Sequence, residues 1–321
     1  MPAQLDVIFG TGPVGCWTAR ALRRQGRAVR AVNRNGVRPD LMPADVEMVK
    51  ADVADQTQSC AAAKGASVVY QALNPPYHLW REFFPGLQAG ALAAAKAVNA
   101  RFVSIENLYM YDSSRPMTED SPVAPVSKKG ALRQEMAAEV MAVHKRGEVR
   151  TTALRSSDYY GPGVLGSALG ERVFGNLVAG KKAQITGSTQ MLHSFAYIED
   201  VGNAATALGM NDEALGRVWI APHAPARTQG EMVEEACGVL GMEARFSVVS
   251  PFMMRLAGLF IPDARASVEM MYEFTAPFVV DSTRIERGLG LSATPIRVAI
   301  ERTVAWYRER LARRRGHARS S

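Results

Sequence analysis

The stretch that decides the fold is VIFGTGPVGCWTARALRRQG, from Val7 to Gly26. An apolar run precedes Gly10, Gly12 and Gly15, which have the spacing G-x-G-x-x-G, and a segment with helical apolar periodicity follows. In a dinucleotide-binding turn the first glycine permits the bend, the second admits a pyrophosphate, and the third lets helix and strand pack. The free N–H groups of the helix start also favour an anion. The sequence therefore predicts a dinucleotide site at Gly10, Gly12, Pro13, Val14 and Gly15.

The rest of the first half repeats the same alternation of apolar runs and amphipathic stretches. Strands are predicted at 5–9, 28–32, 46–51, 67–73, 102–106 and 150–155. Helices are predicted at 16–25, 57–63, 86–98 and 131–144. Apolar strands that alternate with helices are typical of a parallel sheet covered on both faces. We therefore expect an α/β fold of the Rossmann type, a doubly wound parallel sheet with a smaller C-terminal substrate lobe.

The pattern changes after Arg155, where a loop rich in Gly and Pro is followed by Met-rich and aromatic segments. We expect residues 1–155 to form the dinucleotide-binding domain, with later strands returning to it near 190–205. Residues 156–310 should form mainly the substrate-binding lobe. Residues 311–321 should be a basic tail, solvated and frayed.

Bulk properties exclude several classes of protein. The formal charge of +7 lies largely in this tail and near the glycine motif, so it favours an anionic cofactor and not a nucleic-acid partner. Cys16, Cys60 and Cys237 have no metal-ligand or disulfide spacing. No leader pattern and no membrane-spanning apolar run is present. We expect a cytoplasmic protein that binds no metal and no membrane.

The end of the second predicted strand indicates which cofactor is preferred. An NAD site usually has a carboxylate there for the ribose 2′-hydroxyl, whereas this chain has Asn33 and Arg34. An arginine can pair with a 2′-phosphate, so NADP(H) is predicted, with NAD(H) as the alternative. Asp52 and Val53 would lie beside the adenine, and Ala72 would leave room for the ribose. Asn74 and Ser156 are further candidates for cofactor binding.

Motifs along nearly the whole chain carry a family resemblance. After the glycine motif and Asp52-Val53 these are Tyr111-Asp112, Pro116-Met117-Thr118-Glu119, Leu154-Arg155, Tyr160-Gly161-Pro162-Gly163, the run SFAYIEDV at 194–201, Gly288-Leu289-Gly290 and the run TVAWY at 303–307. The chain resembles the extended short-chain dehydrogenase/reductase superfamily, also called the NAD-dependent epimerase/dehydratase family, and looks like one of its atypical branches. The resemblance implies a cofactor domain, a substrate lobe and, in many members, a homodimer formed through two helices of each subunit.

The resemblance also implies where the catalytic serine, tyrosine and lysine of the family should stand. Those positions are held by Asn107, Lys129 and Arg133. All three catalytic residues are therefore substituted, and the acid–base chemistry must differ from that of the family.

The three replacements form a chemically coherent set. Lys129 and Arg133 are four residues apart on a predicted helix and share one face. Arg133 can bond the cofactor ribose but cannot relay protons. Its charge should lower the pKa of Lys129 and make that lysine an acid–base group, while Asn107 polarises a carbonyl. Tyr109 is the second candidate proton donor, and a merely solvated Lys128–Lys129 helix start stays open.

The substrate is expected to be a bulky, hydrophobic small molecule. The second half has no obvious diphosphate-binding cluster, and its Met-rich segments are typical of an adaptable apolar pocket. We therefore predict an NADP-dependent oxidoreductase that acts on a hydrophobic carbonyl, enone or alcohol. The alternatives are an isomerase or lyase driven by Lys129, and a non-catalytic NADP-binding redox sensor. The predicted pocket residues are Pro76, Tyr77, His78, Tyr159, Tyr160, Met253, Met270 and Tyr272.

Overall fold

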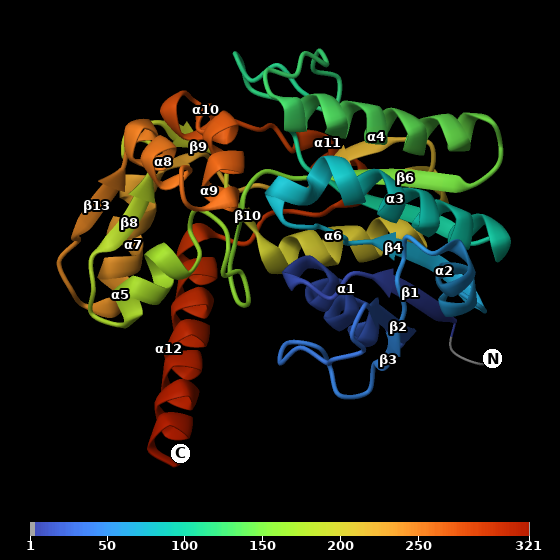
Figure 1. The fold of residues 1–321 in the computed structure, drawn as a ribbon, viewed down its shortest axis with the longest axis horizontal. Coiled ribbons are helices and arrows are strands. Elements are labelled where there is room, and N and C mark those ends of the chain that lie inside the picture. The colour runs from blue at the N-terminus through green and yellow to red at the C-terminus, as the bar shows by residue number, and fades with distance from the viewer. Residues whose placement is uncertain (1–3, 321) are drawn as a thin grey trace.

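The computed structural model describes the backbone of residues 4–320 and the side chains as far as Gly316. Within this range the centre is a sheet of seven parallel strands (Figure 1). In spatial order they are β11 (Val218–Ile220), β6 (Arg150–Arg155), β5 (Arg101–Glu106), β4 (Ala66–Gln71), β1 (Leu5–Phe9), β2 (Ala28–Asn33) and β3 (Glu47–Lys50). The winding direction reverses between β1 and β4, which is the arrangement of a doubly wound Rossmann sheet. The predicted fold class is confirmed.

Helices cover both faces of the sheet, and alternate residues of β1 face opposite sides. Ile8 is buried in the same cluster as Leu208, whereas Val7 and Phe9 belong to the opposite cluster with Val140. Each such side chain stabilises the fold by about 1.5–3 kcal/mol. One face carries α1 (Pro13–Arg24) and α6 (Ile198–Met210), and the other carries α2 (Gln56–Ala62), α3 (Trp80–Ala97) and α4 (Lys128–Lys145) (Figure 1).

A smaller lobe lies to one side of the sheet and has its own apolar core, which includes Phe174, Val233, Ile300 and Tyr307 (Figure 1). Its elements include η2 (Glu171–Gly175), α5 (Asn176–Val178), β8 (Ala183–Thr186), α7 (Gln229–Leu240), β13 (Phe246–Val249), α8 (Pro251–Ala257), α9 (Pro262–Ser267), η4 (Val268–Met270), α10 (Tyr272–Thr275) and α12 (Ile296–Ser320). The remaining short elements are η1 (Tyr77–Leu79), β7 (Tyr159–Tyr160), β9 (Leu192–His193), β10 (Ala196–Tyr197), η3 (Asp212–Ala214), β12 (Arg227–Thr228) and α11 (Thr283–Leu289).

The stretch near 190–205 differs from the prediction of returning strands. It holds β9 and β10, which pair outside the main sheet, and the first half of α6. Val201, Ala205 and Leu208 recur at helical spacing and are buried against α1, so this apolar stretch covers the sheet instead of extending it. The strand that returns to the sheet is β11. The domain boundaries at 155 and 310 stay predictions.

The basic tail also differs from the prediction, because α12 continues as a helix to Ser320. Arg310 and Arg314 donate to the two carboxylate oxygens of Glu171, at 2.7 and 3.4 Å, and hold the helix against the smaller lobe. Throughout residues 4–320 we find no helix that is both long and apolar enough to cross a bilayer.

Candidate functional site

The three glycines of the turn after β1 differ in what a side chain would meet. Gly10 has a φ of +103°, and a Cβ atom there would lie 2.3 Å from the carbonyl oxygen of Ala72. A Cβ atom at Gly15 would lie 2.0 Å from the Gly10 carbonyl oxygen. At Gly12 a Cβ atom would meet nothing within 4 Å. A ligand can therefore approach the backbone at Gly12, beside the N-terminus of α1, and this turn fits the diphosphate of a dinucleotide.

A cavity of about 910 Å³ opens directly beside this turn. Four separate segments line it: the glycine-rich turn, the loop after β2, the loop after β7, and α12. The lining residues are Thr11, Gly12, Pro13, Cys16, Pro39, Asp40, Leu41, Gly163, Leu165, Trp306, Arg310, Arg313 and Arg314. The dinucleotide-binding turn is thus faced by cationic side chains from the C-terminal helix.

Asn33 and Arg34 stand where the sequence predicts the adenosine ribose. The Asn33 amide donates to the Thr11 hydroxyl at 2.9 Å and to the Val37 carbonyl at 2.8 Å, so it braces the glycine-rich turn. Arg34 is exposed. Within the described residues we find no ion pair that holds its guanidinium, which leaves it accessible to a ligand.

The other predicted cofactor residues follow the ends of neighbouring strands. Asp52 is exposed and accepts from the Ala54 N–H at 3.0 Å, and Val53 is buried. Asn74 accepts from the indole N–H of Trp80 at 3.1 Å and so holds the start of α3. Ala72 is half-buried beside Gly10, and Ser156 is buried. Their roles in cofactor binding stay predictions.

Lys129 is buried at the start of α4, and its amine faces the smaller lobe. Its Nζ donates to Glu269 Oε1 at 2.6 Å and to the Ala266 carbonyl at 2.8 Å. It also lies 5.3 Å from the centre of the Tyr77 ring. The backbone N–H of Lys128 donates to the other oxygen of Glu269, at 2.7 Å. This carboxylate therefore holds the Lys129 side chain in an ion pair that the sequence analysis did not predict.

Arg133 and Asn107 are placed by α4 and by the end of β5. Arg133 is 1% exposed, its guanidinium lies 4.7 Å from the centre of the Phe84 ring, and its Nη1 lies 3.7 Å from the sulfur of Met136. Burial lowers its pKa, and its Nε has no partner among the described atoms. Asn107 accepts from the Tyr109 N–H at 3.4 Å. Contacts of either residue with a cofactor stay predictions.

Tyr109 forms a hydroxyl pair that the sequence did not indicate. Its hydroxyl lies 2.6 Å from the Tyr77 hydroxyl. Trp80 stacks on Tyr109 at 6.2 Å and meets the Tyr77 ring edge-on at 4.9 Å. Burial raises the pKa of both tyrosines well above their ordinary range, and the charge of Glu273 raises it further. Both hydroxyls are therefore protonated at neutral pH.

A buried acidic cluster lies near this pair. Glu273 is 2% exposed, and its Oε2 has no hydrogen-bond partner among the described atoms. Burial and the charge of Asp158 raise its pKa well above the ordinary range. His193 connects the two, because its Nδ1 lies 3.0 Å from the Glu273 carbonyl oxygen and its Nε2 lies 3.0 Å from Asp158 Oδ2. A buried carboxyl group with a raised pKa thus lies close to the tyrosine pair.

Some of the predicted pocket residues lie near Tyr77 and Tyr109, and others do not. Met270 and Tyr272 pack in one apolar cluster with Tyr77 and Tyr109. Pro76 precedes η1, where Nδ1 of His78 lies 2.6 Å from Oδ1 of Asp263 in α9, and Tyr159 is half-buried.

Two of the pocket predictions lie elsewhere. Tyr160 is buried in the core of the smaller lobe against Phe174 and Tyr197. Met253 is 50% exposed on α8, because its neighbour Met254 supplies the inward-facing side chain at that turn. Neither position supports a contact with a substrate near Tyr109.

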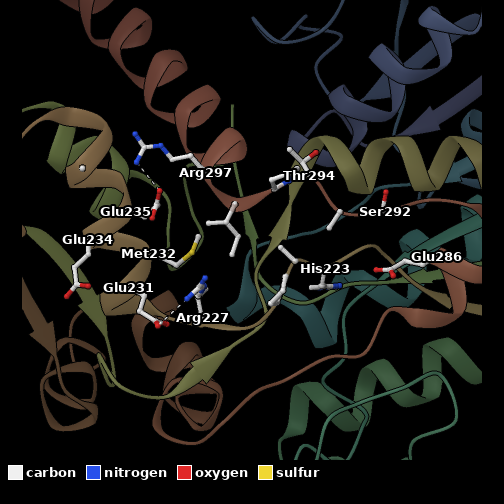
Figure 2. Close-up of a pocket in the computed structure, with 16 residues that line it drawn as sticks. His223, Arg227, Glu231, Met232, Glu234, Glu235, Glu286, Ser292, Thr294 and Arg297 are labelled. Atoms are coloured by element: carbon white, nitrogen blue, oxygen red, sulfur yellow. Dashed lines mark hydrogen bonds and ion pairs between the residues drawn. The ribbon is translucent and has the colours of Figure 1, made fainter.

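A second cavity, of about 850 Å³, lies in the smaller lobe between α7 and the segment that leads into α12 (Figure 2). Both of its arginines pair with glutamates: Arg227 Nη1 lies 3.4 Å from Glu231 Oε1, and Arg297 Nη1 lies 3.0 Å from Glu235 Oε1 (Figure 2). None of the residues predicted for catalysis or cofactor binding lines this cavity.

The sequence analysis missed several candidate functional residues near Lys129, Tyr109 and the glycine-rich turn. The partner of Lys129 is Glu269, 140 residues away, and Glu273 and the arginines of α12 are also remote in sequence. The one local signal for the hydroxyl pair was that Tyr77 and Tyr109 each follow a predicted strand. The sequence analysis nevertheless named Tyr77 only as a pocket residue.

The match with known proteins agrees with this architecture. The model of the NAD dependent epimerase/dehydratase family matches residues 7–220. UDP-glucuronic acid 4-epimerase from Bacillus cereus, in complex with UDP-glucuronic acid and NAD, has a TM-score of 0.76 at 16% identity, over 95% of this chain and 99% of that one. An epimerase from Methanothermobacter thermautotrophicus has a TM-score of 0.80 at 18% identity, over 98% and 95% of the two chains. At such identities the likeness concerns the fold, and no curated protein sequence matches significantly.

Proposed function

The chain belongs to the NAD-dependent epimerase/dehydratase family, and from this premise we propose that it is an NAD(P)-dependent oxidoreductase acting on an apolar carbonyl compound or alcohol. Membership makes it an enzyme of the short-chain dehydrogenase/reductase type that binds a nicotinamide dinucleotide. The observation that carries the proposal is the hydroxyl pair of Tyr77 and Tyr109, 2.6 Å apart inside an apolar cluster.

The proton donor in this proposal is Tyr109 and not Lys129. Nζ of Lys129 is held 2.6 Å from a carboxylate oxygen of Glu269, and this ion pair turns the amine toward the smaller lobe. Tyr109 is a neutral phenol, because burial raises its pKa. A neutral phenol can donate a proton to an oxyanion, and Tyr77 is hydrogen-bonded to it and can replace that proton.

The reduction follows from these positions. NAD(P)H, when bound, would supply the hydride that reduces a carbonyl carbon. Tyr109 donates its hydroxyl proton to the carbonyl oxygen as negative charge develops there, and the Asn107 amide N–H stabilises the same charge. Tyr77, which is half-buried, then returns a proton to Tyr109 through their shared hydrogen bond and regains one from water. The product is the alcohol, and oxidation of an alcohol runs through the same groups in reverse.

The substrate class follows from the side chains around the hydroxyl pair. Trp80, Phe84, Met136 and Met270 are buried in the same cluster as Tyr109. Large aromatic and thioether groups favour an apolar ligand with a single polar group near Tyr109. The substrate proposed here therefore differs from the UDP-glucuronic acid held by the Bacillus cereus epimerase.

We also propose that NADP is preferred over NAD. Arg34 is exposed at the end of β2 and can pair with a 2′-phosphate. The Bacillus cereus epimerase holds NAD, but at 16% identity it does not determine the choice for this chain.

Replacement of the hydroxyl pair tests the proposal. Tyr109→Phe should lower kcat by about 10²–10⁴-fold, because it removes the proton donor but keeps the ring. Its Kd for NADPH should stay almost unchanged. Lys129→Met should have a smaller effect on kcat. The measurement is NADPH oxidation with a panel of aryl ketones, enones and long-chain aldehydes.

The matched control is Tyr160→Phe, which removes a hydroxyl from the core of the smaller lobe and should leave kcat unchanged. If Tyr109→Phe is harmless and Lys129→Met abolishes turnover, the lysine is the acid–base group. If the wild type binds NADPH but turns over no ketone, enone or alcohol, the oxidoreductase is rejected in favour of an isomerase, a lyase or a sensor.

A further inference from the structure

The C-terminal half of α12 runs beside the glycine-rich turn. Trp306, Arg310 and Arg313 are spaced four and three residues apart, so they lie on one face of the helix. With Arg314 they line the same cavity as Thr11, Gly12 and Pro13. A helix of the smaller lobe thus faces the place where the backbone is open to a ligand.

The side of the cavity that α12 forms is rich in cationic side chains. The neighbouring Glu171 carboxylate lies 2.7 Å from Arg310 and 3.4 Å from Arg314, and Asp40 also lines the cavity. Three arginine side chains thus line the cavity beside the positive end of the α1 dipole, which also favours an anion.

We propose that Arg310, Arg313 and Arg314 form a clamp on the phosphate groups of the bound dinucleotide. The ligand would lie between the backbone at Gly12 and the guanidinium groups of α12. The cavity extends from Gly12 to Leu41 in the loop after β2, so it spans the places expected for the diphosphate and for a 2′-phosphate. The clamp rests on the cofactor binding of the proposed function and not on its substrate or proton donor.

A clamp of this kind would let the smaller lobe contribute directly to cofactor affinity. Guanidinium groups bind phosphate through paired N–H donors, which gives them geometric fit as well as charge. Because part of the site is exposed, salt should weaken the contact. The cofactor would also fix the two parts of the molecule relative to each other.

The test is a double variant that keeps Arg310, since this residue holds α12 to Glu171 and lies over Trp306. Arg313→Gln with Arg314→Gln preserves helix propensity and removes two charges. We expect the Kd for NADH to rise about ten- to a hundred-fold, with a shallower dependence on salt. Fluorescence titration of NADH and NADPH, and calorimetry with ADP, 2′-AMP and adenosine, give the readouts.

The matched control is Arg308→Gln with Arg315→Gln, two arginines on the opposite side of the same helix. It removes the same charge and should leave every Kd unchanged. A loss confined to NADH, NADPH and ADP assigns the clamp to the diphosphate, and a loss confined to NADPH and 2′-AMP assigns it to the 2′-phosphate.

Three outcomes overturn the clamp: no change in the first variant, equal losses in both variants, or an equal loss for adenosine, which has no phosphate. Because ADP binding needs no turnover, the clamp can stand even if the substrate or the proton donor proposed above is wrong. If the wild type binds none of these nucleotides, the clamp and the proposed function both fail.

Discussion

At the scale of a single residue, we predict that Arg34 decides whether a 2′-phosphate is recognised. Its side chain is exposed at the end of β2, and Asn33 beside it is already bonded to Thr11 and Val37. Arg34→Ala should therefore raise the Kd for NADPH about ten- to a hundred-fold and leave that for NADH nearly unchanged. Titration by nicotinamide fluorescence measures both values. Equal affinity of the wild type for NADH and NADPH would refute this role.

The glycine motif shows how much of the site a sequence can predict. The spacing of Gly10, Gly12 and Gly15 falls within six residues, so a local pattern predicts the turn, although Gly10 also packs closely against Ala72. The environment of Lys129 depends on Glu269, and that of Tyr109 on Tyr77. Such contacts arise when remote segments pack, and no local spacing specifies them. The sequence therefore named Tyr109 as a candidate but ranked Lys129 above it.

The strands and helices were predictable to the extent that their apolar pattern is local. β1 lies at Leu5–Phe9, as its apolar run predicts. The sequence pattern predicted a helix start at 86, whereas α3 begins at Trp80. The helix therefore contains Pro85, a residue that is disfavoured inside helices. The Trp80 indole is anchored to Asn74 and to the Pro75 carbonyl, and these contacts extend the helix past the proline.

The packing of α1 against α6 requires a glycine. A Cβ atom at Gly202 would lie 2.6 Å from the carbonyl carbon of Trp17 and 2.9 Å from the backbone nitrogen of Thr18. Backbone atoms cannot move aside cheaply, so Gly202→Ala should lower the free energy of unfolding by about 1–3 kcal/mol. Urea denaturation measures this change. Since α1 also carries the glycine-rich turn, NADPH affinity should fall as well.

Gly238→Ala is the matched control for this prediction. It lies in α7, where the nearest atom to an added Cβ is Arg297 Nη1 at 3.7 Å, an ordinary contact. Alanine is favoured over glycine inside a helix by about 1 kcal/mol, so this variant should be neutral or stabilising. Equal losses in the two variants would show that the close approach of α6 to α1 is not the cause.

At the scale of the whole molecule, His223 connects the central sheet to the segments beside the smaller lobe. It follows β11, and its Nδ1 lies 2.6 Å from the Ala221 carbonyl oxygen. Its Nε2 accepts from the Ser157 N–H at 3.3 Å, and its backbone N–H donates to the Ser282 hydroxyl at 3.1 Å. Because Nε2 is an acceptor in this arrangement, the folded protein requires the neutral imidazole.

Stability should therefore fall as the solution becomes acidic. Burial, together with the charge of His193, lowers the pKa of His223 from 6.5 to about 4 in the folded protein. Below pH 6.5 the unfolded chain binds a proton at His223 that the folded chain does not, so this contribution to stability is lost as the pH falls. Between pH 7.5 and pH 5 the loss should be about 2 kcal/mol.

Urea denaturation at the two pH values should give this loss for the wild type. His223→Gln removes the titrating group but keeps an amide donor and acceptor, so it should be less stable at pH 7.5 and lose about 2 kcal/mol less on acidification. The other histidines and carboxyl groups titrate in both proteins, and their contributions cancel in the difference. An equal loss in both proteins would mean that His223 does not govern the acid sensitivity of the fold.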